Sequence, residues 1–248
     1  GDLVDGGVLN LAVSSSPTDE GSWNPNHALA ANVDVQDLLE PTLSTMWIVA
    51  DDGTWTANPD YATSIDPHTD YFDPRSADRF EEPQTVTVTL NEKAVWPDGT
   101  PITANDYAAT YAAAGGAADG YETVPSSVFD AIASVDVVSD FEYTVEFSGA
   151  YADWASLFST PVLPAAIAND KEAFNTGFAS EPVPSAGPYM VSAVDNNAKI
   201  YTMVPNPVWW GENAPKLDTI TWKVVSQESL PQSFANDEID ALTIQTPD

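Results

Sequence analysis

Residues 85–90 carry the pattern that most constrains how this chain folds. The sequence TVTVTL places Val86, Val88 and Leu90 on one face and three threonines on the other. Strict alternation with period two is typical of a strand that buries one face and leaves the other in water. The stretch therefore predicts a half-buried strand.

A sharp corner follows that strand. Trp96 runs into a Pro-Asp-Gly turn, and Thr103 lies where it caps the start of an alanine-rich helix. Asp106 occupies the capping-box position, near the positive end of the helix dipole. The helix should end at Gly115 and Gly116. Burial of a tryptophan contributes about 2 kcal/mol and a helix cap about 1 kcal/mol, so the corner is expected to be structural.

Strand and helix patterns alternate along the rest of the chain, without a repeat or a low-complexity tract. Strands are expected at residues 8–13, 129–139, 141–148, 187–206 (two strands joined at Asn196 and Asn197) and 218–225, where Trp222 should face the core. Helices are expected at residues 28–40, 152–159 and 161–168, and in 229–246 before a final strand. Interspersed elements of both kinds indicate an α/β (mixed α+β) class.

The charge balance excludes several partners. Seven Lys and Arg residues face 38 Asp and Glu residues, for a formal net charge of -31. A surface this acidic repels nucleic-acid phosphates and anionic lipid headgroups. No apolar run approaches the ~20 residues that span a bilayer. The polar start GDLVDGG is expected to lie behind a leader or a lipid-anchor site.

Reactive groups are scarce. The chain has no Cys, and its two histidines, His27 and His68, are isolated from one another in the sequence. There is no G-x-S-x-G elbow and no phosphate-binding glycine motif. The acidic segment 66–83 lacks the spacing of a calcium loop, which predicts a solvated loop. We therefore expect no catalytic residue, no metal site and no cofactor, and a binding role for some of the eight tryptophans.

A glycosidase is the enzyme alternative, because carboxylates are abundant. Two carboxylates about 5 or 9 Å apart in a deep cleft would support it.

Four stretches, taken in order, resemble one family. They are QTVTVTLNEKAVWPDGTPITANDYAATYAA (84–114), SAGPYMV (185–191), NPVWWGENAPKLDTITWKVV (206–225) and FANDEIDALTI (234–244). Together they resemble the family 5 extracellular solute-binding proteins of ABC importers, the group that includes oligopeptide-, dipeptide- and nickel-binding proteins. Shorter stretches such as SWNPNH (22–27) and YADWASLFS (151–159) resemble an actinobacterial lipoprotein branch of that family.

The resemblance implies a fold and a domain plan. The fold is the type II periplasmic-binding-protein-like fold, cluster C, in which two lobes close on a ligand. Family members are about twice as long as this chain, so we expect the first lobe alone, with the second lobe absent. Residues 1–40 and 150–248 would form the core of the ligand-binding lobe, and residues 41–149 a smaller scaffold subdomain.

The resemblance also implies a site. The loop after the first strand would offer main-chain and hydroxyl groups to the ligand, Trp23 and Asn24 would extend its rim, and Gly187 and Pro188 would line the cleft floor. The loop residues are Ser14, Ser15, Ser16, Pro17 and Thr18. A solvated turn is an equally good interpretation of the serine run.

The function implied is the extracellular solute-binding component of an ABC importer, which binds peptide or another small solute and passes it to permease subunits. It would be a monomer at the outer face of the cytoplasmic membrane, attached only by a lipid anchor outside this sequence. The alternative is a regulatory cell-envelope lipoprotein of the same fold, which binds glycolipid or envelope proteins and transports nothing.

Overall fold

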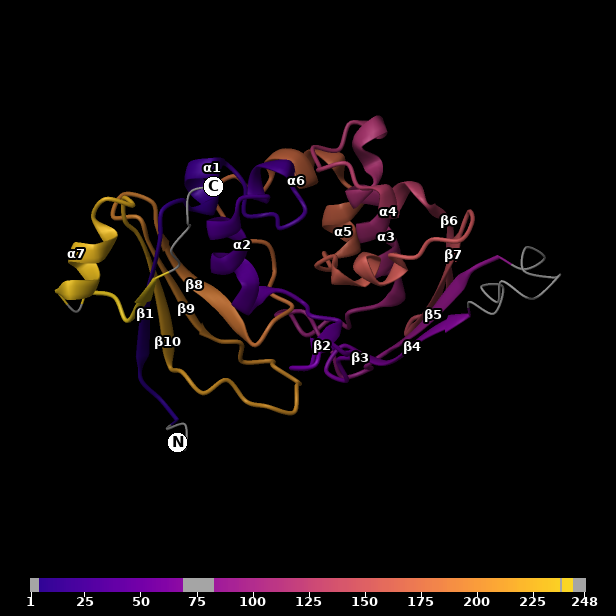
Figure 1. The fold of residues 1–248 in the computed structure, drawn as a ribbon, viewed down its shortest axis with the longest axis horizontal. Coiled ribbons are helices and arrows are strands. Elements are labelled where there is room, and N and C mark those ends of the chain that lie inside the picture. Colours follow the sequence, from indigo (N-terminus) through magenta and orange to yellow (C-terminus); the bar gives the residue numbers. More distant parts are fainter. Residues whose placement is uncertain (1–4, 69–82, 237, 243–248) are drawn as a thin grey trace.

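In a computed structural model, the described residues form a four-stranded sheet, a five-stranded sheet and a two-stranded hairpin, and helices lie between the two larger sheets (Figure 1). The structure describes residues 5–68, 83–236 and 238–242. The interspersed strands and helices predicted from the sequence are confirmed. Among the described helices, none has both the length and the apolar character needed to cross a bilayer.

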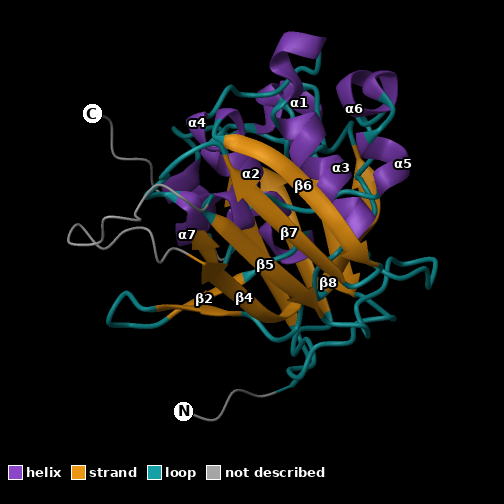
Figure 2. Cartoon of the chain, turned by 90° about the vertical axis from the view of Figure 1, so that its right-hand side faces the viewer, coloured by secondary structure: helices purple, strands orange, loops and turns teal. Residues whose placement is uncertain are grey.

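The first sheet has four antiparallel strands in the order β4-β5-β7-β6. The strands are β4 (Ala62–His68), β5 (Thr85–Leu90), β6 (Ile132–Ser139) and β7 (Glu142–Phe147). Val86, Val88 and Leu90 are all buried, which confirms the half-buried strand predicted at residues 85–90. Figure 2 shows the four strands side by side, with helices gathered above them.

The corner after β5 is built around one carboxylate. Asp106, only 7% exposed, accepts hydrogen bonds from Trp96 Nε1 (3.1 Å), Thr103 N (2.9 Å) and Ala165 N (2.7 Å). It forms the predicted capping box at the start of α3 (Ala104–Ala114), which ends at Gly115 as predicted. The buried indole therefore gives its N–H to the same carboxylate that caps the helix. The corner is structural, as predicted.

Short helices cover α3 and complete the core of the first sheet. They are η4 (Gly116–Asp119), α4 (Ser127–Asp130), η5 (Trp154–Ser159), α5 (Ala165–Ala168) and α6 (Lys171–Thr176). Leu157 and Phe158 of η5 lie in the same apolar cluster as Val86 and Tyr107. The helix predicted at residues 152–159 is thus a shorter 3-10 helix.

The second sheet has five strands in the order β11-β1-β10-β9-β8. The strands are β1 (Val8–Val13), β8 (Tyr189–Asp195), β9 (Ile200–Pro205), β10 (Thr219–Val224) and β11 (Ala241–Leu242). Strand β1 runs parallel to β10 and β11, whereas β9 is antiparallel to both β10 and β8. Trp222 on β10 is buried in the core, as predicted.

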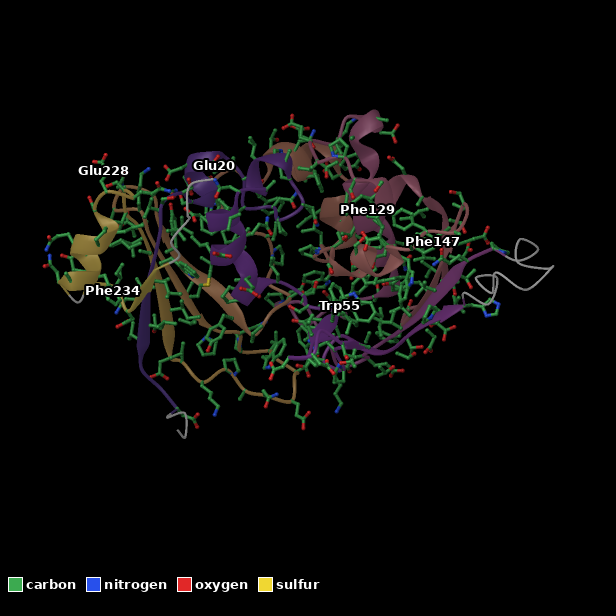
Figure 3. All side chains as sticks on the ribbon, in the orientation of Figure 1. Glu20, Trp55, Phe129, Phe147, Glu228 and Phe234 are labelled. Atoms are coloured by element: carbon green, nitrogen blue, oxygen red, sulfur yellow. The ribbon has the colours of Figure 1, made fainter. Side chains whose placement is uncertain are left out.

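Helices lie on both faces of the second sheet (Figure 1). Helix α2 (Val33–Leu39) packs on one face, where Val13 joins Leu38 in an apolar cluster. Helix α7 (Leu230–Ala235) packs on the other, where Ala12 meets Leu230. Successive residues of β1 thus enter cores on opposite faces, as strand pleating requires. Phe234 of α7, labelled in Figure 3, stays 50% exposed.

The single helix predicted at residues 28–40 is wrong. A 3-10 turn, η1 (Ala28–Ala30), comes first, and α2 starts afresh after Asn32, whose side chain accepts from Asp34 N at 2.9 Å. A second 3-10 turn, η2 (Glu40–Thr42), follows α2 directly. The extended backbone of Asn32 (φ -72°, ψ 138°) interrupts the helix, because an N-cap residue has non-helical angles.

A two-stranded hairpin completes the described fold. Its strands are β2 (Trp47–Val49) and β3 (Trp55–Ala57), and Trp55, labelled in Figure 3, is 47% exposed. Of the acidic segment 66–83, residues 69–82 lie outside the described residues, so its predicted solvated loop stays a prediction. Asp66 itself lies in β4.

Candidate functional site

The predicted ligand loop, residues 14–18, leaves the sheet where β1 and β10 end together. Asp34, on the first turn of α2 and 3% exposed, accepts Ser14 N at 2.8 Å and Ser15 N at 3.1 Å. The Ser14 hydroxyl donates to the same oxygen of Asp34. One buried carboxylate therefore fixes the main chain of the loop entrance.

The far half of the loop is held by the β8–β9 hairpin. Ser16 is fully buried, and its Oγ accepts a hydrogen bond from the Tyr201 hydroxyl at 2.9 Å. Ser16 also caps α1 (Pro17–Glu20) by accepting from Asp19 N at 3.2 Å. Thr18 Oγ1 donates to Asn196 Oδ1 at 2.9 Å. The loop is thus a fixed edge of the sheet, with Ser14, Ser15 and Thr18 only half-buried.

An ion pair ties α1 to the same hairpin. Lys199 Nζ donates to Asp19 Oδ1, and this hydrogen bond, with a smaller contribution from Ser16, lowers the pKa of the Asp19 carboxyl. The same contact raises the pKa of the Lys199 amine. Lys199 adopts φ 54°, in the left-handed region, where it closes the turn between β8 and β9.

Trp23 and Asn24 lie in the interior. Both are 0% exposed, and Trp23 meets Tyr201 edge-on with ring centroids 5.1 Å apart. Trp23 Nε1 donates to Thr18 Oγ1 at 3.1 Å, and Asn24 Nδ2 donates to Phe174 O at 3.1 Å. Trp23 thus supports the loop from the interior, whereas Asn24 is tied to α6. The rim contact expected for the two residues stays a prediction, and neither side chain is exposed.

Gly187 and Pro188 lie at the opposite end of the second sheet. Tyr189 pairs with Pro205, whereas Ile200 at the other end of β9 pairs with Lys223 next to the loop. The two ends of the six-residue strand β9 are roughly 17 Å apart. The structure therefore does not bring the two groups of predicted site residues together.

Gly187 has a structural reason to be glycine. A Cβ there would lie 2.5 Å from Pro41 O and 2.7 Å from Thr42 C, both backbone atoms. Its own carbonyl accepts from Asn206 Nδ2 at 3.0 Å. The ligand contact predicted for Gly187 and Pro188 remains untested by this packing.

Sequence reasoning missed the residues that hold the loop: Asp34, Asn196, Lys199 and Tyr201. The Asn32-x-Asp34 spacing signals a helix start, yet nothing local shows that Asp34 reaches back to Ser14. The other three are brought to the loop by the pairing of β9 with β10 and of β10 with β1. Only tertiary structure supplies that contact.

Two hollows border α2. One, of about 340 Å³, is lined by His27, Gln36 and Thr123 among others, and the other, of about 360 Å³, by Asp37, Glu40 and Trp47 among others. His27 is 2% exposed and its Nε2 lies 3.1 Å from Glu122 Oε2. Within the described residues, no three His, Asp or Glu side chains converge as metal ligands. The side chains that line these two hollows include hydroxyls, amides and carboxylates, which are groups that can form hydrogen bonds with a polar ligand.

Residues 39–248 match the family model described as bacterial extracellular solute-binding proteins, family 5 Middle. The chain belongs to this family. The family predicted from the sequence motifs is therefore confirmed.

A curated protein and a solved structure are similar to this chain over nearly its whole length. The oligopeptide-binding protein OppA of Mycobacterium tuberculosis strain H37Rv is 37% identical over 249 residues, covering 99% of this chain and 40% of OppA. The solved periplasmic EDTA-binding protein EppA is 29% identical with a TM-score of 0.80, over 98% of this chain and 44% of EppA. This family 5 chain thus spans about 40% of the length of the curated relatives it matches.

A more distant structure shows the fold alone. The oligopeptide-binding protein AppA of Bacillus subtilis, solved with a nonapeptide, is 18% identical with a TM-score of 0.77, over 97% of this chain and 44% of AppA. The predicted type II periplasmic-binding-protein-like fold is confirmed by these neighbours.

Proposed function

We propose that this chain forms one lobe of an extracellular solute-binding protein that captures a peptide or another small solute for an ABC importer. Its membership of family 5 is the observation that carries the proposal. The second lobe would come from sequence beyond these 248 residues, because the chain covers about 40% of its OppA relatives. Permease subunits would be the protein partners.

The loop 14–18 would be this lobe's share of the site. Its main chain is already fixed by Asp34 and by the β8–β9 hairpin, so little conformational freedom is lost when a ligand binds. Ser14, Ser15 and Thr18 retain partial exposure at the end of the sheet. A pre-ordered edge of this kind suits hydrogen bonding to an extended peptide.

The proposed role is binding without chemical change. Solute-binding is the activity that the family description names. A monomer, held at the outer face of the membrane by a lipid anchor outside this sequence, would fit such a role.

The division into subdomains is part of the proposal. Residues 1–40 and 150–248 would form the ligand-binding lobe core, and residues 41–149 the scaffold. Leu157 and Phe158 enter the core of the four-stranded sheet, so the two parts would share apolar contacts near that boundary.

A variant that loosens the loop 14–18 by weakening its hydrogen bonds to Asp34 tests the proposal. In the two-lobed protein, Asp34→Asn should weaken peptide binding about tenfold, because two main-chain hydrogen bonds of about 1 kcal/mol each would be weakened. The measurement is the peptide Kd by calorimetry, with folding checked by circular dichroism. Glu92→Ala, at an exposed residue that follows β5 in the four-stranded sheet, is the control and should leave the Kd unchanged. An unchanged Kd in folded Asp34→Asn would contradict a ligand role for this loop.

A further inference from the structure

A hollow of about 560 Å³ opens beside the Trp96 corner and shares no residue with the loop 14–18. It is enclosed by the Trp96 corner, by α5, and by the segment before β8 together with the start of β8. Its walls are apolar, with four prolines among the lining residues and with Ile167, Phe178, Val183 and Met190 between them. The volume lies within the range of about 300–1,000 Å³ that small-molecule sites occupy.

Apart from Asp98, the polar side chains in the walls already have partners. Ser185 Oγ lies 2.5 Å from Tyr189 O and 3.2 Å from Thr42 O, and Trp96 Nε1 donates to Asp106. A ligand inside the hollow would therefore meet apolar surface and gain mainly from leaving water.

Asp98 is the charged residue among the described residues that line the hollow. Its Oδ1 accepts from Thr100 Oγ1 at 2.6 Å and from Thr100 N at 2.9 Å, and these bonds lower the pKa of the Asp98 carboxyl. Within the described residues, Oδ2 receives no hydrogen bond from the protein. The mouth of the hollow thus offers a carboxylate oxygen that is open to a further donor.

We propose that this hollow is a second binding site, which takes an amphipathic amine with its apolar chain against Ile167, Phe178 and Met190 and its ammonium group at Asp98. Charge complementarity favours this class of ligand. The protein carries a formal net charge of -31, which opposes an anionic head group, and the local carboxylate attracts a cationic one. The site does not depend on the solute site proposed for the loop.

A homologous series of alkylamines, from butylamine to octylamine, tests the proposal on the 248-residue chain by calorimetry. Affinity should rise about fourfold for each added methylene until the hollow is full. The alcohol of equal length should bind more weakly, and the carboxylate most weakly. Affinity that ignores chain length, or that is equal for amine and carboxylate, would overturn the proposal.

Two variants locate the site. Ala166→Trp fills the hollow from an exposed position on α5 and should abolish amine binding, whereas Ala112→Trp, on the exposed face of α3 and outside the lining, should leave the affinity unchanged. Asp98→Asn, at an exposed turn, should reduce the affinity for the amine to that for the alcohol. Wild-type affinity in either Ala166→Trp or Asp98→Asn would show that the amine binds elsewhere.

Discussion

Two buried tryptophans, Trp23 and Trp222, differ in the hydrogen bonding of the indole N–H, and the difference should affect stability. Trp23 Nε1 donates to Thr18, whereas Trp222 Nε1 is buried with no hydrogen-bond partner among the described residues. An unpaired buried donor costs about 1–3 kcal/mol, so Trp222→Phe removes a penalty while Trp23→Phe removes a bond. We expect Trp23→Phe to lower the free energy of unfolding by about 2 kcal/mol more than Trp222→Phe in urea. Equal losses would contradict this difference.

The Asp19–Lys199 pair predicts a pH dependence. The folded pKa of Asp19 lies below its ordinary value of 3.8, so its contribution to stability is present above that pH and is lost as the pH falls through the folded pKa. The pKa of Lys199 is raised, so the pH dependence of its contribution to stability has the opposite sign. That contribution is present below pH 10.5 and is lost as the pH rises through the folded pKa. Lys199→Gln should therefore destabilise the protein at neutral pH. The difference from wild type should shrink below about pH 4 in urea titrations. A difference that stays constant down to about pH 2 would argue against the pair.

At the scale of elements, the break between η1 and α2 is a specific claim about residues 31–32. Val33 is the first residue of α2 and Asn32 is extended, so proline at residue 33 loses no helical hydrogen bond and suits the residue before it. Val33→Pro should change the free energy of unfolding by less than about 1 kcal/mol relative to Val33→Ala. A loss of about 3 kcal/mol or more would show a helix that continues through residue 33.

Some elements of this chain could be predicted from local sequence patterns, and others could not. Period-two alternation at residues 85–90 and the Thr103–Asp106 cap are local patterns, and both predictions are confirmed. The break at Asn32 was missed because the apolar residues around it keep helical spacing, although Asn32 is itself a good N-cap residue. The loop 14–18 was a local prediction, whereas Asp34, which holds it, is recruited from the next helix.

At the scale of the whole molecule, sequence reasoning assigned the loop and the pair Gly187 and Pro188 to one cleft, and strand pairing puts them at opposite ends of the second sheet. The ligand contacts predicted for both groups stay predictions. Strand order is a long-range property that motif spacing does not encode. Family membership, by contrast, could be predicted from four motifs, because each combines turn, cap and strand signals in a fixed order.

The central claim is that this lobe binds a solute only together with a second lobe. Thermal unfolding of the two-lobed protein and of the 248-residue chain, each with a peptide library, tests it most directly. A peptide at 100 times its Kd should stabilise the two-lobed protein by about 2.7 kcal/mol, while the single chain should shift little. An equal shift in the 248-residue chain would contradict the claim, as would the lack of any shift in the two-lobed protein.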